Sequence, residues 1–250
     1  MRFPRLLVRG RFLSREKRFL VHVLLDDGRT VTAHTNNTGR MTGALAPDAP
    51  VWLSPAADPR RRLAWTLEIV ETTAHTGPGI APGVLVGVNT MLANTLVAEA
   101  VGVGLVAGLA PAGAPRREVS YGRRGSRIDL LYEPTTGPPV WVEVKNVSLV
   151  THGHARFPDA PSARGRKHLQ ELAEIAAGGG RALLVFCVQR GDAASVGPAD
   201  DIDPDYGQEL RRAARAGIEI RGVRMDVTPE GIRPVAALPL RLENFPDRST

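Results

Sequence analysis

Two carboxylates and an amine near the middle of the chain have the types and spacing that metal-assisted hydrolysis requires. Asp129 lies in the segment SRIDLLY, and Glu143 and Lys145 follow in the alternating segment VWVEVKNV. Residues i and i+2 of a strand share a face, so Glu143 and Lys145 project the same way. If the two segments are neighbouring strands joined by the turn EPTTGPP, the three groups lie side by side.

This arrangement predicts a site for a divalent cation. Two carboxylates at adjacent strand ends suit a hard ion such as Mg²⁺ (or Mn²⁺), which takes few protein ligands and keeps several waters. A lysine beside them can hold a metal-bound water or stabilise charge on a phosphoryl oxygen. We therefore predict Asp129, Glu143 and Lys145 as catalytic residues for phosphodiester hydrolysis. The spacing alone also fits an ordinary solvated sheet face.

A third carboxylate, Glu99, lies on the apolar stripe of an expected helix, with Leu92 and Leu96 before it and Val103 after it. Burying a carboxylate without a partner is costly, and a metal shared with Asp129 and Glu143 would remove that cost. Glu99 is therefore predicted as a third metal ligand and catalytic residue. The alternative is a glutamate at the helix edge that pairs with an arginine.

Residues 1–80 have the pattern of a small β-barrel. Short alternating segments follow one another without a helical period, and Asp27-Gly28 is a hairpin signal. The segments are LLVRGRFL, KRFLVHVLL, RTVTAHT, PVWLS and LAWTLEIV. Five-stranded barrels include the OB-fold, although a strand count does not separate it from other small barrels. The stretch Ala74–Gly83, rich in glycine and proline, predicts a linker and a domain boundary near residue 80.

Residues 81–250 alternate helices with strands, which predicts an α/β sandwich. The expected helices begin at Asn89 or Thr90, at Ser162 and at Asp203, and the last two end at Gly178 and Gly217. The expected strands are SRIDLLY, VWVEVKNV, RALLVFCVQ and IEIRGV. RALLVFCVQ is too apolar for an edge strand and is predicted to be central.

Charge is concentrated on the expected barrel. The chain carries +6, and its first 83 residues have twelve Lys or Arg against seven Asp or Glu. Such an excess favours a polyanionic partner. The helix start in ARGRKHLQEL also favours phosphate binding, although part of that run is a solvated helix face. The polar side chains of TAHTNNTG suit hydrogen bonds either to nucleic acid or within their own turn. The predicted nucleic-acid contacts are Arg11, Lys17, Arg18, His34, Asn36, Asn37, Arg164, Lys167 and His168.

Several other classes lose support. The single cysteine, Cys187, excludes an intramolecular disulfide and is predicted to be a packed thiol. No apolar run of about eighteen residues occurs and the N-terminal residues are charged throughout, so we expect a cytoplasmic protein without membrane contact. His152 and His154 are too weak a pair to predict zinc. In the acidic run 200–205, Asp203 is better explained as a helix cap than as part of a calcium loop.

Long blocks of the chain resemble a known family. Asp and ExK on adjacent strands, after a helix that carries a glutamate, resemble the PD-(D/E)XK nuclease superfamily. The blocks KRF, TAHTNNTGRM, GVNTMLAN, SRIDLL, VEVKNVSL, ARFPDAPSARGRKHLQEL and PADDIDPDYG resemble the bacterial sugar fermentation stimulation protein A family over nearly the whole chain. This resemblance implies an N-terminal OB-fold, a C-terminal nuclease-like domain, sequence-independent DNA binding and a link to sugar metabolism. The nuclease positions map onto Glu99, Asp129, Glu143 and Lys145, with Ile128 in place of the motif's proline.

Two hypotheses follow. In the first, a basic barrel holds DNA while the acidic site hydrolyses a phosphodiester bond with Mg²⁺. In the second, the protein is a regulatory or architectural DNA binder whose carboxylates hold a structural ion or stabilise the sheet. A small-molecule enzyme of a sugar pathway is a third reading that needs a pocket. A homo-oligomer is expected only by analogy, because nucleases that cut two strands often act as pairs.

Overall fold

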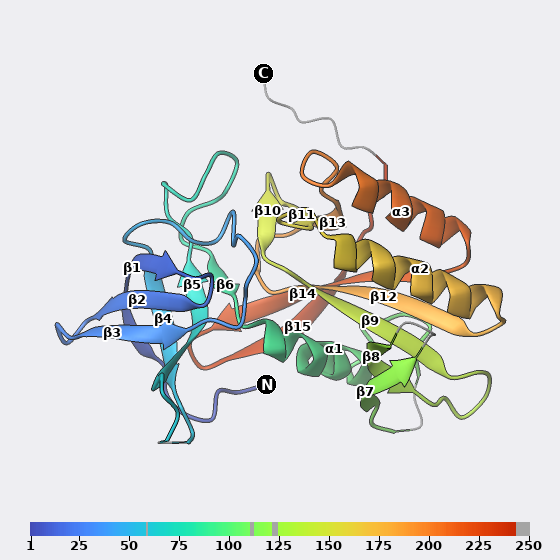
Figure 1. Ribbon diagram of the computed structural model, residues 1–250, viewed down its shortest axis with the longest axis horizontal. Helices are drawn as coiled ribbons and strands as arrows, with labels where there is room; N and C mark the ends of the chain where they lie inside the picture. The colour runs from blue at the N-terminus through green and yellow to red at the C-terminus, as the bar shows by residue number, and fades with distance from the viewer. Residues whose placement is uncertain (59, 111–112, 122–124, 244–250) are drawn as a thin grey trace.

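The computed structural model describes residues 1–58, 60–110, 113–121 and 125–243, and it contains two units (Figure 1). The N-terminal unit is a closed β-barrel, and the C-terminal unit is a mixed sheet flanked by helices. This architecture confirms the predicted fold class of an OB-type barrel followed by a mixed-sheet α/β domain.

Five strands close the barrel. They are β1 (Val8–Glu16), β2 (Leu20–Leu25), β3 (Thr30–His34), β4 (Pro50–Pro55) and β5 (Trp65–Glu71). β1 pairs with β2 and β4, and β5 pairs with β4 and, in parallel, with β3, which completes the ring. Val21, Val23 and Leu25 alternate inward along β2 and are fully or almost fully buried. This alternation, read from the sequence as strand, supplies the barrel core.

The sheet of the barrel continues past the predicted boundary near residue 80. A short strand, β6 (Leu85–Gly87), pairs with β5, and the backbone N–H of Gly87 donates to the carbonyl of Gln189 in the second unit at 2.8 Å. The expected linker is the loop before β6. At the other end, Phe3 N–H donates to the carbonyl of Glu230, so the first residues of the chain pack on the second unit.

The C-terminal sheet has the order β15-β14-β12-β9-β8-β7. Its strands are β7 (Arg116–Tyr121), β8 (Ser126–Tyr132), β9 (Val140–Val147), β12 (Arg181–Val188), β14 (Glu219–Thr228) and β15 (Gly231–Leu238). The apolar strand β12 is central and runs parallel to both neighbours, as its composition predicted. Cys187 is a fully buried thiol on this strand, and burial raises its pKa. A separate small sheet joins β10 (Leu149–Thr151), β11 (His154–Phe157) and β13 (Ser195–Pro198).

Helices cover both faces of the large sheet, with α1 on one face and α2 and α3 on the other (Figure 1). Their bounds are α1 (Ala93–Gly102), after the 3₁₀ turn η1 (Thr90–Leu92), α2 (Ala163–Ala177) and α3 (Pro204–Arg215). The predicted caps Ser162 and Asp203 are confirmed, because their side chains accept the N–H groups of Gly165 and Tyr206. No helix in the described ranges is both long and apolar enough to cross a membrane.

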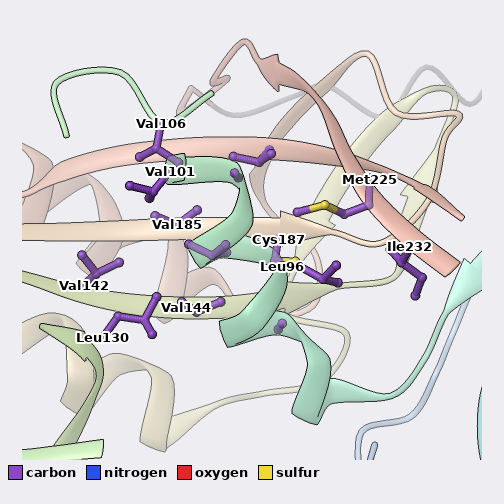
Figure 2. Packing of buried hydrophobic residues seen from close by; sticks show 14 of the residues in the cluster. Leu96, Val101, Val106, Leu130, Val142, Val144, Val185, Cys187, Met225 and Ile232 are labelled. Carbon is purple, nitrogen blue, oxygen red and sulfur yellow. The ribbon is translucent and has the colours of Figure 1, made fainter. Parts of the chain in front are cut away.

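Alternation along β9 separates a packed face from a polar one. Val142 and Val144 lie under α1, where Leu96 joins them in a continuous apolar cluster (Figure 2). The intervening residues Glu143 and Lys145 therefore face the side of α2. The polar pair among the valines is thus the consequence of one strand serving two different environments.

Two buried polar groups join the units. The guanidinium of Arg190 is fully buried, pairs with Asp192 at 2.7 Å and donates to the carbonyls of Gly43, in the barrel, and Ser148, in the second unit, at 2.9 and 2.8 Å. Such a group is satisfied only while both units are in place.

The second joint is Asn89, which lies between the barrel and η1. Its side-chain amide donates to Glu68 of β5 at 2.8 Å, and its oxygen accepts from Asn36 at 2.9 Å and from the Met91 N–H at 3.1 Å. Glu68 also accepts from Ser54 at 2.6 Å, and burial raises the pKa of its carboxyl. The predicted cap at Asn89 is therefore also an inter-unit tie.

Candidate active site

β8 and β9 diverge where Asp129 lies. Backbone pairing begins at Leu130 opposite Val142, and at the next position the Val144 N–H donates instead to Oδ2 of Asp129 at 2.7 Å. Oδ1 accepts from the side chain of Asn94 on α1 at 3.1 Å. The Asp129 carboxylate therefore takes the place of a backbone acceptor between β8 and β9, and it is held by groups from β9 and α1.

Glu143 and Lys145 leave β9 on the same side, as the spacing predicted. Nζ of Lys145 donates to Oε1 of Glu143 at 2.7 Å, and the two side chains are 11% and 3% exposed. A cleft of about 600 Å³ opens over Asp129 and this pair and is also lined by Arg164 and Lys167. The structure therefore brings together three of the four predicted catalytic residues.

His168 on α2 contacts the same oxygen of Glu143 as Lys145 does. Its Nδ1 lies within hydrogen-bonding distance of Oε1 of Glu143, while Nε of Arg164 donates to its Nε2 at 3.3 Å. Because Nε2 accepts, Nδ1 is the nitrogen that carries the proton and donates to Glu143. His168 is buried, so its predicted role as a phosphate contact is replaced by that of a carboxylate partner.

The electrostatics of the two carboxylates differ. Burial alone would raise the pKa of Glu143, but Lys145 and His168 outweigh it and hold that pKa below its usual value. For Asp129, burial and the neighbouring charge of Glu143 raise the pKa to about 6, against the bonds from Val144 and Asn94. Oε2 of Glu143 is buried and has no hydrogen-bond partner in the described part of the chain. One carboxylate oxygen is thus free for a ligand.

The raised pKa of Asp129 predicts a stability that depends on pH. Between its usual value of 3.8 and about 6 the folded state binds more protons than the unfolded state, so stability falls as pH rises through this window. The cost above pH 6 is at most about 3 kcal/mol. We expect Asp129→Asn to raise the free energy of unfolding relative to the parent at pH 7.5 but not at pH 4. Urea unfolding of both proteins without metal tests this, and an equal difference at both pH values would contradict it.

Glu99 is not brought to the site. Its Oε2 pairs with the amino group of Met1 at 2.6 Å, and that amino group also donates to the carbonyl of Ile232 on β15 at 2.6 Å. β15 and β8 are separated by four strand spacings of about 4.8 Å each. Glu99 therefore cannot share an ion with Asp129, and the expectation of a three-carboxylate site is corrected. Its partner is an amino group rather than the arginine of the alternative.

Two site residues were missed from the sequence. Asn94, the second residue of α1, contacts Asp129 from the helix that was expected to supply Glu99. Glu118 on β7 is exposed, has a positive φ of 52° and lines the same cleft. Asn94 lies in GVNTMLAN, one of the blocks that carry the family resemblance, and this was the available signal. Glu118 lies on an edge strand, β7, that the hydrophobic pattern did not predict.

The predicted barrel contacts divide into two groups. Arg11, Lys17 and Arg18 are exposed, and the ion pairs within the described barrel involve other cations, at Arg9, His22, Arg29 and Arg60. Lys17 and Arg18 form the β1–β2 turn with positive φ values of 48° and 64°. Positive φ is uncommon for residues with a Cβ and often marks functional turns.

The polar turn holds itself together. Asn36 donates to Asn89, and Oδ1 of Asn37 accepts the Gly39 N–H at 2.9 Å, so both amides serve the structure of the turn, the alternative left open by the sequence. His34 packs against Phe19 with ring centroids 6.1 Å apart, and burial lowers the pKa of His34.

Of the predicted contacts in the second unit, Arg164 is exposed and Lys167 lies 3.7 Å from Glu171.

The histidines outside the site do not form a metal centre. His154 is buried against Ser195, with Nδ1 and Oγ 2.9 Å apart, while His152 is exposed. Within the described ranges no cluster of three or more His, Cys, Asp or Glu residues is arranged to hold a metal. The candidate site itself offers the two neighbouring carboxylates of Asp129 and Glu143.

An OB barrel followed by a mixed sheet, with an acid pair and a lysine on neighbouring strands, defines a two-domain protein of the mixed α/β class. The family model for the SfsA N-terminal OB domain matches residues 13–88, and that for the sugar fermentation stimulation protein RE domain matches residues 91–231. The chain belongs to the sugar fermentation stimulation protein (SfsA) family.

Individual relatives agree with this assignment. A sugar fermentation stimulation protein homolog from Thioalkalivibrio sulfidiphilus is 51% identical over 93% of this chain and 94% of its own length. One from Geobacter metallireducens is 48% identical over 97% and 100%. The solved structure of Pyrococcus furiosus SfsA in complex with Ca²⁺ is similar with a TM-score of 0.84 and 27% identity, covering 96% of this chain and 98% of that one.

Proposed function

We propose that the protein binds DNA independently of sequence and hydrolyses phosphodiester bonds with a divalent cation held by Asp129 and Glu143. The observation that carries this proposal is the buried Oε2 of Glu143, which has no hydrogen-bond partner among the described residues and belongs to a carboxylate that lines the same cleft as Asp129. A buried acceptor without a donor is costly, and a cation would remove that cost. The Ca²⁺ in the Pyrococcus furiosus relative supports a divalent ion in the family.

The donor set fits a hard cation. Two carboxylates supply oxygen ligands and leave the remaining positions to water, which is the coordination that Mg²⁺ and Mn²⁺ accept. When bound, the ion would supply a Lewis acid for the phosphoryl oxygen and a water of lowered pKa.

The residues of the chain position these groups. His168 and Lys145 both donate to Oε1 of Glu143, which fixes the carboxylate and leaves Oε2 for the ligand. Val144 and Asn94 fix Asp129 by donating to Oδ2 and Oδ1 respectively. The ammonium of Lys145 lies at the cleft, where it stabilises negative charge on the phosphate that undergoes attack.

Barrel cations are expected to make DNA binding dependent on salt. Replacing Lys17 or Arg18 with alanine should reduce the slope of log K against log salt by about 0.7 to 0.9 for each phosphate contact removed. Replacing Arg233, an exposed arginine of β15 paired with Asp226, should leave the slope unchanged. Fluorescence anisotropy with labelled DNA in EDTA measures both. If all these proteins show the slope of the parent, the barrel is not the DNA-binding surface.

The nuclease proposal is tested by giving purified protein plasmid, single-stranded and branched DNA with Mg²⁺, Mn²⁺ or EDTA. The parent should cut only with metal, and a Glu143→Gln protein purified in parallel should not cut. Equal cutting by both proteins would identify a contaminant and remove the support for the site.

A second candidate is a DNA-binding regulator without catalysis. One observation favours it: the described residues bring only two carboxylates together, and Lys145 already neutralises one of them. In that case the carboxylates stabilise the sheet or hold a structural ion, and the link to sugar metabolism would operate through DNA binding. The same experiment distinguishes the two, because this protein would bind DNA and leave it uncut with either metal.

A further inference from the structure

A second hollow of about 560 Å³ adjoins the carboxylate site. It shares Asp129, Lys145 and Arg164 with the cleft described above, and apolar side chains, including Met91 and Phe157, also line it. Met91 belongs to η1 and lies one helical turn before Asn94, the residue that contacts Asp129. An apolar surface therefore lies about one helical turn from the predicted position of the reacting phosphate.

Met91 is an exposed apolar residue just before α1. Its side chain is 71% exposed, whereas Leu96 and Val97 are fully buried. An unbranched, polarisable thioether adapts to flat aromatic surfaces, and apolar side chains such as methionine are inserted between bases in protein–DNA complexes. Phe157 is held in place by Tyr206, with ring centroids 5.1 Å apart. The hollow thus combines one adaptable apolar group with one fixed aromatic group.

The third wall of the hollow is a rigid loop of the barrel. Asn37 and Thr38 line it, and the loop is tied to the second unit by Asn36, which donates to Asn89, and by the Met41 N–H, which donates to Asp159 at 2.9 Å. Because both ends of the loop are bonded across the joint, the wall is fixed in place while the units stay together.

Size limits what the hollow can hold. Its volume lies within the range of about 300 to 1,000 Å³ typical of small-molecule pockets, so it has room for one or two nucleotides and not for a duplex. An adjoining hollow of about 820 Å³ shares Thr38, Phe157 and Arg164 with it and is lined by Arg18 and Arg40. Neither Arg18 nor Arg40 has a carboxylate partner in the described part of the chain. The two hollows together offer cations for a backbone and an apolar surface for a base.

We propose that Met91 and Phe157 contact an unpaired nucleobase next to the phosphodiester held at Asp129, Glu143 and Lys145. The preferred substrate is therefore DNA with a single-stranded segment at the site, whose backbone continues past Arg164 toward Arg18 and Arg40. This inference rests on the proposed function. It adds that the base is read by apolar contact and that a fully paired duplex must open before it can bind productively.

Binding is measured in EDTA by fluorescence anisotropy, with an oligonucleotide offered as a single strand, as a blunt duplex and as a duplex with a short flap. The parent should bind the single strand and the flap at least about tenfold more tightly than the blunt duplex. Met91→Ala should weaken binding of the first two by roughly fivefold, the lower end of the loss that removal of an aromatic stacking partner causes, and leave the duplex unaffected. Val103→Ala, which truncates a residue 65% exposed just after α1 and away from the hollow, should change none of them.

A base analogue whose fluorescence reports unstacking gives a second measurement. With 2-aminopurine placed at successive positions of the flap, one position should change its emission on binding to the parent and not on binding to Met91→Ala. The inference is overturned if the parent binds blunt duplex as tightly as single strand, or if Met91→Ala weakens all three substrates equally or none. Because binding is measured without metal, a protein that cuts nothing but shows this selectivity refutes the nuclease proposal alone. Cutting with unchanged Met91→Ala binding refutes the base contact alone.

Discussion

A Glu143→Gln protein is expected to lose at least about a thousandfold in metal-dependent cleavage, because it removes one of the two carboxylates proposed to hold the ion and the Lewis-acid stabilisation that the ion would supply. The glutamine oxygen can still accept from Lys145 and His168, so the protein should fold as the parent does. Single-turnover cleavage of a labelled flap substrate measures the loss, and thermal unfolding checks the fold. Activity within tenfold of the parent would exclude Glu143 from the site.

Lys145→Met provides the complementary variant. It removes the ammonium proposed to stabilise charge at the phosphate, and loss of such a group typically lowers the rate by about a hundredfold to a thousandfold. It also removes a cation that lowers the pKa of Glu143, so the acid limb of the pH–rate profile should move to higher pH. Arg233→Met loses one positive charge at an exposed ion pair on β15 and should leave rate and profile unchanged. A reduced rate with an unmoved profile would separate catalysis by Lys145 from its effect on Glu143.

The second large effect is expected on stability. Arg190→Leu leaves Asp192 without its partner and the carbonyls of Gly43 and Ser148 without a donor, in a place where the parent side chain is fully buried. Removing one member of a buried pair costs about 3–5 kcal/mol. For a chain of this length that corresponds to a fall in Tm of roughly 10 °C. Calorimetry should also show the transition broaden or divide, because Arg190 joins the two units.

A matched exposed pair serves as the control. Arg233→Leu breaks the ion pair with Asp226, whose side chains are 73% and 39% exposed, and should cost less than about 1 kcal/mol. Adding Asp192→Asn to Arg190→Leu should recover part of the lost stability, because it removes the uncompensated charge. If the single and double variants unfold at the same temperature, the buried charge is not the cause.

The sequence predicted the elements whose residues alternate clearly. The barrel strands and the shared face of Glu143 and Lys145 follow from the period of two in a strand, whereas the central β12 follows from its continuous apolar run. The strands of the small sheet, β10, β11 and β13, have three or four residues each. Segments this short show no period, and their pairing depends on contacts distant in sequence, so local patterns do not reveal them.

The errors at the site have a common origin. Glu99 was assigned from a stripe that included Val103, yet Val103 is 65% exposed, so the stripe ends before it. The partner of Glu99 is the amino group of Met1, which is distant in sequence, so helical periodicity does not reveal it. For His168 a local signal was present, since the buried residues Gly165, His168 and Leu172 follow a helical spacing. This spacing places His168 on the buried face of α2, whereas its basic neighbours Arg164 and Lys167 had suggested a phosphate contact.

The tie at Asn89 limits how this architecture can be recombined. Asn36 and Glu68 of the barrel and the Met91 N–H of η1 all use the same amide side chain. A chimera that takes its barrel from one homologue and its second domain from another inherits a working joint only if these partners are transferred as a set. A chimera joined at the boundary between the barrel and the second domain would separate Asn89 from its partners in the barrel and would disturb Met91 as well. Evolution of the barrel is therefore constrained by residues that lie beyond its last strand.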